Sequence, residues 1–227
     1  MATASKETVM ETERLKLVRM TDSSKGSKHL EWFHRLWSDE GATSWSLRGA
    51  TKSYEDSQEW MQKNLGPEID EIMWAVFTRP SPSTTSSAAP TEDDDANFIG
   101  IVGLRKYPTF FFKGPPLPND KLKTADGEQR QPSEFRMVGY SFIASSWGHG
   151  YATEAGQAVL SNYAESGGAD VKGKRYVEAA VDRTHQASIR VLEKLGLRKV
   201  GWHEEEGRLL IGGQWREKAC WVYGVWL

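Results

Sequence analysis

A glycine turn between an apolar strand and a helix is the feature of this sequence best suited to chemistry. Residues 138–144 are largely apolar, the turn Gly148-His149-Gly150 follows, and Tyr151-Ala152-Thr153-Glu154-Ala155 begins a helix. The first N–H groups of a helix lack intrahelical partners and carry partial positive charge, so they bind anions. Glycine lets a phosphate approach the backbone closely. The spacing therefore predicts a phosphate site held by main-chain atoms.

Two other phosphate-binding turns fit this sequence less well. A P-loop closes with Gly-Lys-Ser or Gly-Lys-Thr, and neither occurs here. A dinucleotide-binding turn has a third glycine where this chain has Thr153, and an acid at the end of the next strand. Asp170 precedes that strand and Asp182 comes after it. A nucleotide-dependent oxidoreductase is therefore the weakest interpretation, and only an observed binding of nicotinamide would revive it.

The turn instead resembles the pyrophosphate-binding turn of the GNAT acetyltransferases. Tyr151–Ala155 is similar to that turn in the branch that acetylates ribosomal proteins, and three further stretches match the branch in order. They are Thr12–Arg19, similar to its first strand, Phe98–Leu104, similar to its third, and Ala187–Leu197, similar to the helix after its fifth strand. The resemblance runs from about Glu11 to Trp226. It implies an α/β (α+β) GNAT fold, with a mixed central sheet of about seven strands flanked by helices.

The apolar periodicity agrees with such an order of elements. It predicts strands at 15–19, 73–78, 98–107, 138–144, 175–181, 199–203 and 220–226, and helices at 29–37, 54–65, from 151, and from a Thr184 cap to Gly196. We expect one domain over residues 1–227 with two insertions. The first, 80–97, is acidic, of low complexity and expected to be flexible. The second, 108–132, carries Phe110-Phe111-Phe112, which would cover a groove, contact another subunit or simply pack on the domain.

Composition narrows the class of protein further. The chain has 227 residues, 38% of them hydrophobic, which is enough for a substantial core. Its 29 basic and 31 acidic residues nearly balance, so no nucleic-acid surface and no membrane partner are expected. Cys220 is the only cysteine, which excludes an internal disulfide and a cysteine-rich zinc site. With no apolar leader in its first thirty residues, the protein is expected to be cytoplasmic.

The resemblance implies acetyl-CoA as co-substrate and no metal. Its pyrophosphate would lie on Gly148, His149, Gly150, Tyr151, Ala152 and Thr153, and its pantetheine arm would pair with the backbone at Phe142, Ile143 and Ala144. The chemistry requires a neutral amine as nucleophile, a donor for the thioester carbonyl and a proton source for the departing thiolate.

The resemblance also implies the catalytic residues. The proton source corresponds to Ser188, which would also touch the cofactor. The branch has an asparagine three residues earlier, whose amide contacts the cofactor, but this chain has His185. That histidine would keep the contact, take over proton transfer, or be solvated near a helix start. The implied glutamate base falls in the run Glu204-Glu205-Glu206, an expected solvated turn, and we take Glu205 and Glu206 as the candidates.

The leading hypothesis is therefore an N-acetyltransferase that acetylates a primary amine, either a protein N-terminus or a small molecule. The acceptor would enter between the first two helices and the loop Gly207–Arg216. The alternative is an acyl-CoA-binding regulatory module without turnover, favoured by His185 and opposed by the intact Ser188. The aromatic insertion and an edge strand would each suit a homodimer, but neither requires one.

Overall fold

The structure, a computed structural model, describes residues 8–79, 94–106, 134–166, 175–211 and 214–227. Its elements, in chain order, are β1 (Val9–Glu11), β2 (Leu15–Met20), α1 (Lys28–Trp37), α2 (Tyr54–Leu65), β3 (Ile72–Thr78), η1 (Asp94–Asn97), β4 (Phe98–Lys106), β5 (Glu134–Phe142), η2 (Ala144–Ser146), α3 (Tyr151–Glu165), β6 (Arg175–Val181), α4 (Gln186–Lys194), β7 (Arg198–Ile211) and β8 (Gln214–Trp226). The predicted second insertion, 108–132, lies outside the described residues, as does 80–93 of the first.

The strands form one mixed sheet of eight strands in the order β1-β2-β3-β4-β5-β6-β8-β7. Only β5 and β6 pair in parallel within this described sheet. The predicted mixed sheet with flanking helices is confirmed. The extra strand is the short β1, whose three residues carry too little pattern to be recognised in the sequence.

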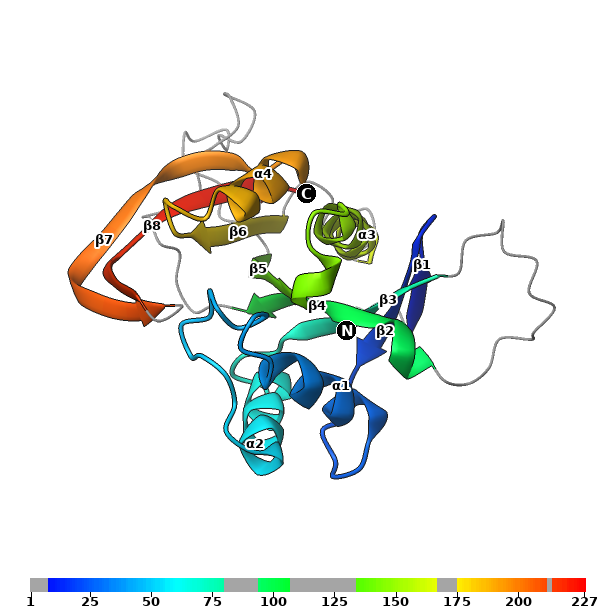
Figure 1. Ribbon diagram of the computed structural model, residues 1–227. Coiled ribbons are helices and arrows are strands. Elements are labelled where there is room, and N and C mark those ends of the chain that lie inside the picture. The colour runs from blue at the N-terminus through cyan, green and yellow to red at the C-terminus, as the bar shows by residue number, and fades with distance from the viewer. Residues whose placement is uncertain (1–7, 80–93, 107–133, 167–174, 212–213) are drawn as a thin grey trace.

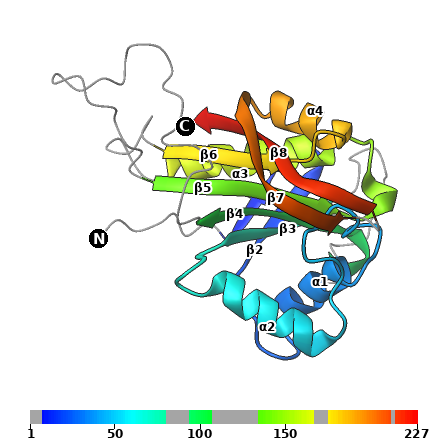
Figure 2. The ribbon, with the colours of Figure 1, turned by 90° about the vertical axis from the view of Figure 1, so that its left-hand side faces the viewer.

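Two helix pairs cover the two faces of the sheet, α1 and α2 on one and α3 and α4 on the other (Figure 1; Figure 2). The alternation of side chains along each strand divides the core accordingly. In β2, Leu15 and Leu17 pack in the cluster that contains Val159 of α3 and Leu192 of α4. Met20 packs with the buried residues of α1 and α2. Each strand residue can therefore be assigned to the α1–α2 side or the α3–α4 side.

The helices begin where short polar residues or glycines permit. Ser27 and Ser53 accept a backbone N–H at the starts of α1 and α2, as N-caps do. The prediction that Thr184 caps the fourth helix is wrong, because the N-cap is His185, which makes no side-chain capping bond. The Thr184 hydroxyl donates to Asp182 instead.

The last two strands are longer than the sequence predicts. Residues 204–206 were expected in a turn and Gly207–Arg216 in a loop, but β7 continues through them to Ile211 and β8 begins at Gln214. A register shift between Glu204 and Arg208 absorbs extra residues while the pairing continues. The resulting hairpin curls over one end of the sheet (Figure 1).

No helix in the part of the chain that the structure describes is long and apolar enough to cross a membrane.

Candidate functional site

The glycine turn lies at the start of α3, as the sequence predicts. Gly148 and Gly150 have φ angles of 81° and 82°, in the left-handed region that favours glycine. Gly150 is the N-cap of α3 and provides no side-chain capping bond. Helix geometry leaves the amides of Tyr151 and Ala152 directed toward the space in front of the helix, whereas the Thr153 N–H donates to the Gly150 carbonyl at 3.1 Å. A side chain added at Gly148 would meet none of the described atoms within 4 Å, so an anion has room to approach this backbone.

An ion pair between Arg14 and Glu154 lies beside the turn. The Arg14 guanidinium donates to the His149 carbonyl at 3.0 Å and lies 5.0 Å from the centre of the Tyr151 ring. It also pairs with Glu154 at 2.6 Å. Burial raises the pKa of Glu154, but hydrogen bonds from Thr12 and Arg14 outweigh burial and hold it below its ordinary value. Glu154 thus ties α3 to the first strands, and its carboxylate offsets the charge of Arg14 beside the turn.

Strand β5, which precedes the turn, separates from its neighbour β6 partway along its length. The parallel pairing of β5 with β6 ends at the pair Met137–Glu178. Beyond it, Val138–Phe142 of β5 still pair with β4, but within the described sheet they have no partner on the β6 side. We call this gap, between Val138–Phe142 and Ala179–Val181, the strand opening. Gly139 and Ala180 on its two edges are exposed.

Two hydroxyl groups meet beside the strand opening. The Ser188 Oγ of α4 lies 2.7 Å from the Tyr140 Oη of β5. Burial raises the pKa of Tyr140 to about 12, while the hydrogen bond to Ser188 opposes that rise. Tyr140 is therefore a neutral donor near neutral pH. The sequence located Ser188 but gave no sign of Tyr140, whose role depends on the register of β5 against α4.

His185 lies in an aromatic and polar cluster. Its ring stacks on Trp45 of the α1–α2 loop, with the centroids 4.1 Å apart. The Arg216 guanidinium of β8 lies 4.5 Å from the centre of the Trp45 ring and donates to the Thr184 hydroxyl at 2.6 Å. We call Trp45, His185, Arg216, Thr184 and Asp182 the Trp45 cluster. It joins the α1–α2 loop, the β6–α4 turn and the hairpin, so His185 is not the solvated histidine considered from sequence.

The surroundings of His185 in the Trp45 cluster also determine its protonation state. Burial lowers the pKa of His185, Asp182 opposes that shift and Arg216 reinforces it. The ring is therefore neutral near pH 7 and keeps one N–H donor. A neutral donor matches the hydrogen-bonding capacity of the expected asparagine better than a charged imidazolium would.

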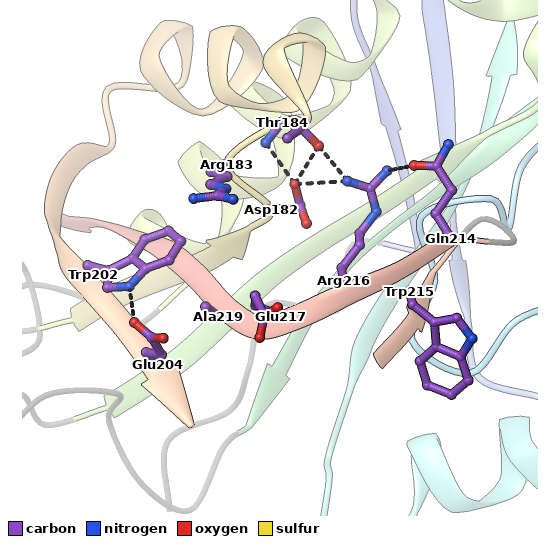
Figure 3. A pocket seen from close by; sticks show the side chains of 10 residues that line it. All are labelled: Asp182, Arg183, Thr184, Trp202, Glu204, Gln214, Trp215, Arg216, Glu217 and Ala219. Carbon is purple, nitrogen blue, oxygen red and sulfur yellow. Dashed lines mark hydrogen bonds and ion pairs between the residues drawn. The ribbon is translucent and has the colours of Figure 1, made fainter. Parts of the chain in front are cut away.

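A cavity of about 410 Å³ lies between the β6–α4 turn and the hairpin (Figure 3). Its lining contains two indoles and charges of both signs: Asp182, Arg183, Thr184, Trp202, Glu204, Gln214, Trp215, Arg216, Glu217 and Ala219. None of the predicted catalytic or cofactor residues is among them. Arg216 contributes to both this cavity and the Trp45 cluster.

The predicted bases Glu205 and Glu206 are exposed residues of β7. Glu205 is ion-paired with Lys218 and lies 3.1 Å from the His203 Nε2. The Lys218 contact, more than that of His203, lowers the pKa of Glu205 and so makes it a weaker base than an ordinary carboxylate. The structure shows no contact that brings either glutamate to Ser188.

The predicted pantetheine-binding stretch follows the strand opening. The Phe142 carbonyl accepts the Trp147 indole N–H at 2.7 Å, and the Ile143 N–H donates to the Ile99 carbonyl at 3.0 Å. Ala144 begins the short helix η2. The Phe142 carbonyl and the Ile143 N–H are therefore already used within the protein, and fewer backbone groups of Phe142–Ala144 remain for a ligand.

Among the residues that the structure describes, no group of three or more histidine, cysteine or acidic side chains is arranged to hold a metal ion.

Comparison with known proteins agrees with this geometry. Residues 14–198 match the family described as acetyltransferase (GNAT) domain. No curated protein matches the sequence. A GNAT-family acetyltransferase from Bacillus anthracis is similar in structure, with a TM-score of 0.58, 20% identity, and coverage of 96% of this chain and 98% of that one.

Two similar structures were solved with coenzyme A. RimL, a ribosomal L7/L12 alpha-N-protein acetyltransferase, has a TM-score of 0.61 and 15% identity over 96% of this chain and 98% of its own. Spermidine N-acetyltransferase from Vibrio cholerae, in complex with CoA and spermine, has a TM-score of 0.60 and 13% identity over 95% of this chain and 96% of its own. At these identities the likeness shows a shared fold.

Proposed function

The chain belongs to the GNAT family of acetyltransferases, and from this premise we propose that it transfers the acetyl group of acetyl-CoA to a primary amine. One observation carries the proposal. The glycine turn and the Tyr140–Ser188 hydroxyl pair lie at the strand opening, where β5 leaves β6. This arrangement supports a site at which a phosphate, the edge of β5 and a proton donor would meet.

The turn suits the pyrophosphate of acetyl-CoA. Backbone N–H groups of Gly148–Ala152 would hold its oxygens, while the Thr153 N–H already donates to the Gly150 carbonyl at 3.1 Å. Arg14 lies beside the turn, where it is paired with Glu154. Next to the turn, the free edge of β5 would pair with the amides of the pantetheine arm, and Phe142–Ala144 contribute those groups not already used within the protein. His185, as a neutral donor, would supply the contact expected of asparagine.

The hydroxyl pair suits the proton transfer. When bound, acetyl-CoA supplies the acetyl group as a thioester, whose carbon–sulfur bond breaks as a carbon–nitrogen bond forms to the amine. Ser188 would donate the proton that the departing sulfur takes, and the Tyr140 hydroxyl, 2.7 Å from the Ser188 hydroxyl, would orient it. The proposed base remains Glu205 or Glu206, as the resemblance implies.

The acceptor is a primary amine at a protein N-terminus or on a small molecule. The two similar structures with coenzyme A represent both kinds of acceptor by name: one is a ribosomal-protein acetyltransferase and the other a spermidine acetyltransferase. On the side of the strand opening that faces α1 and α2, Gly139 and Ala180 are exposed to solvent. Their exposure supports entry of the amine from that side.

Calorimetric titration with acetyl-CoA, followed by a thiol-release assay with peptides and polyamines, tests the proposal. We expect acetyl-CoA to bind and thiol release to depend on the amine. Binding without release would favour the alternative, a regulatory module that holds acyl-CoA without turnover. Failure to bind acetyl-CoA would contradict both, and NADH titrated in parallel covers the oxidoreductase interpretation.

A further inference from the structure

We propose that Trp45 is a positioning residue for the co-substrate and that it acts through His185, which stands where the family branch has asparagine. The Trp45 indole would hold the imidazole in the orientation from which its N–H contacts acetyl-CoA. The inference rests on the proposed acetyl transfer. It extends that function because Trp45 belongs to the α1–α2 loop, on the acceptor side, whereas the contact that it supports is made to the co-substrate.

His185 needs such support because the helix that it precedes does not fix its side chain. It is the N-cap of α4, with a φ of −81° and a ψ of 66°, and its side chain makes no capping hydrogen bond. A side chain that rotates freely loses that freedom when it binds a ligand, and the loss weakens binding. A ring that is already held in its binding orientation avoids the loss.

The stack on Trp45 fixes the plane of the imidazole and leaves the edge of the ring available. The two rings lie 17° from parallel with their centroids 4.1 Å apart, so the indole covers a face of the imidazole. The ring nitrogens lie at the edge, and among the described residues they have no hydrogen-bond partner. Trp45 therefore orients His185 without competing with a ligand for its N–H.

Trp45 is itself held in two ways. The Arg216 guanidinium lies 4.5 Å from the centre of the indole and is anchored by the Thr184 hydroxyl at 2.6 Å. Three residues before Trp45, the Ala42 carbonyl accepts the Ser141 hydroxyl of β5 at 2.7 Å. The α1–α2 loop thus contacts β5 through Ala42 and the start of α4 through Trp45. Contacts at both edges of the strand opening keep the indole in place.

A purely structural stack would behave differently from a positioning one. If Trp45 only stabilised the fold, replacing it would have the same effect whatever residue stood at position 185. If Trp45 acts through the imidazole, its replacement should matter only while the imidazole is present, because one contact can be lost only once. Replacing both residues together separates the two roles.

The test is calorimetric titration of acetyl-CoA into the wild type, Trp45→Leu, His185→Asn and the double variant, which needs no acceptor and no turnover. Trp45→Leu should raise the Kd about 10-fold, because the imidazole loses its support. His185→Asn supplies the amide of the branch and should stay within about 3-fold of the wild type. In that background, Trp45→Leu should change the Kd less than about 2-fold. Trp45→Phe keeps a ring for stacking and should recover most of the affinity.

Trp60→Leu is the matched control. Trp60 of α2 is also half-buried and has the Arg48 guanidinium 4.7 Å from the centre of its ring, but it contacts Trp37 and Phe33 instead of a residue of the site. Its replacement should lower stability and leave the Kd for acetyl-CoA unchanged. If Trp45→Leu does not fold, Trp45→Met takes its place, since methionine fills irregular space without a ring.

Three results would overturn the inference. They are acetyl-CoA binding by Trp45→Leu that equals or exceeds that of the wild type, an equal effect of Trp45→Leu in the His185→Asn background, and an equal rise of the Kd in Trp60→Leu. Failure of the wild type to bind acetyl-CoA would instead contradict the proposed function, and the inference with it.

Discussion

The two sides of the strand opening are built in different ways. On the α3–α4 side, the proposed anion site comes from one short stretch, Gly148–Thr153, and would use mainly backbone atoms. On the α1–α2 side, the Trp45 cluster brings together a helix–helix loop, the β6–α4 turn and the last hairpin. Those segments are far apart in the sequence and meet only through side chains.

This difference separates the two halves of the proposed function. Binding phosphate through the backbone requires only a particular backbone conformation, and a short local sequence with two glycines before a helix is enough to specify it. Selecting an amine needs side chains placed by distant segments. The co-substrate can therefore be inferred from a motif, whereas the acceptor depends on contacts between segments that are distant in the sequence.

The largest effect is expected at the turn, from Gly150→Val. Its φ of 82° strains a branched residue, and the added side chain would stand in front of the first amides of α3. The Kd for acetyl-CoA, measured by calorimetry, should rise at least roughly 100-fold. Gly26→Val is the matched control, because Gly26 has the same φ of 82° but precedes α1, away from the turn. Equal acetyl-CoA affinities in the two variants would contradict the assignment of the turn as the pyrophosphate-binding site.

The next effect concerns turnover. Ser188→Ala should lower kcat about 100-fold, because the departing sulfur loses its proton donor, while the Kd for acetyl-CoA changes little. Tyr140→Phe keeps Ser188 but removes the partner 2.7 Å away, and should lower kcat about 10-fold. Steady-state kinetics with calorimetry measures both. An unchanged kcat in Ser188→Ala would show that the hydroxyl pair is only structural.

The same division explains what the sequence could predict of the fold and the site. The strands and helices of the core were predictable because each has its own apolar period, as in β2, where Leu15 and Leu17 face α3. The turn and Ser188 lie on local motifs. The hairpin was not predictable, since glycine and a run of acids indicate a turn, and only pairing with β8 extends β7 through them.

The residues that the sequence did not reveal all depend on contacts between distant segments. Tyr140 gains its role from Ser188, 48 residues away. Nothing in the sequence distinguishes Trp45 from the other nine tryptophans, and only its stacking on His185 in the structure does so.

A smaller effect, on stability, is expected from the Trp45 cluster. Arg216→Met keeps much of the apolar stem but removes the bonds to Thr184 and Asp182 and the contact with Trp45. The free energy of unfolding, from urea denaturation, should fall by about 2 kcal/mol. The amine KM should also rise, because the α1–α2 loop loses its attachment to the hairpin.

Arg208→Met is the control for that variant. Arg208 lies on the same hairpin, where its contacts are exposed: an ion pair with Glu217 that is 3.9 Å long and a hydrogen bond to the Trp215 carbonyl at 3.2 Å. Such a pair contributes at most about 0.5 kcal/mol, so stability and KM should hardly change. If the two arginine variants were equally stable, the Trp45 cluster would not join the segments as the structure indicates.

The smallest effect is expected where the turn is attached to the first strands. Glu154 accepts hydrogen bonds from Thr12 at 2.5 Å and from the Arg14 backbone at 3.0 Å. Because its pKa is lowered in the folded protein, the ionised carboxylate stabilises the fold above the ordinary pKa of 4.5, and that contribution is lost as the pH falls through the lowered value. Glu154→Gln should therefore cost about 1 kcal/mol at pH 7, and the difference from wild type should shrink in acid.

Urea denaturation of both proteins at pH 7 and at lower pH measures this difference, with Glu31→Gln as the control. Glu31 also lies in the first turn of a helix, α1, so it shares the interaction with the helix dipole, but its partner Lys28 is exposed. Its replacement should cost less than about 0.5 kcal/mol. A difference for Glu154→Gln that stayed constant with pH would mean that packing, rather than the ionised carboxylate, attaches α3 to the first strands. The turn would then depend on distant contacts as much as the acceptor side does, and the contrast between the two sides would weaken.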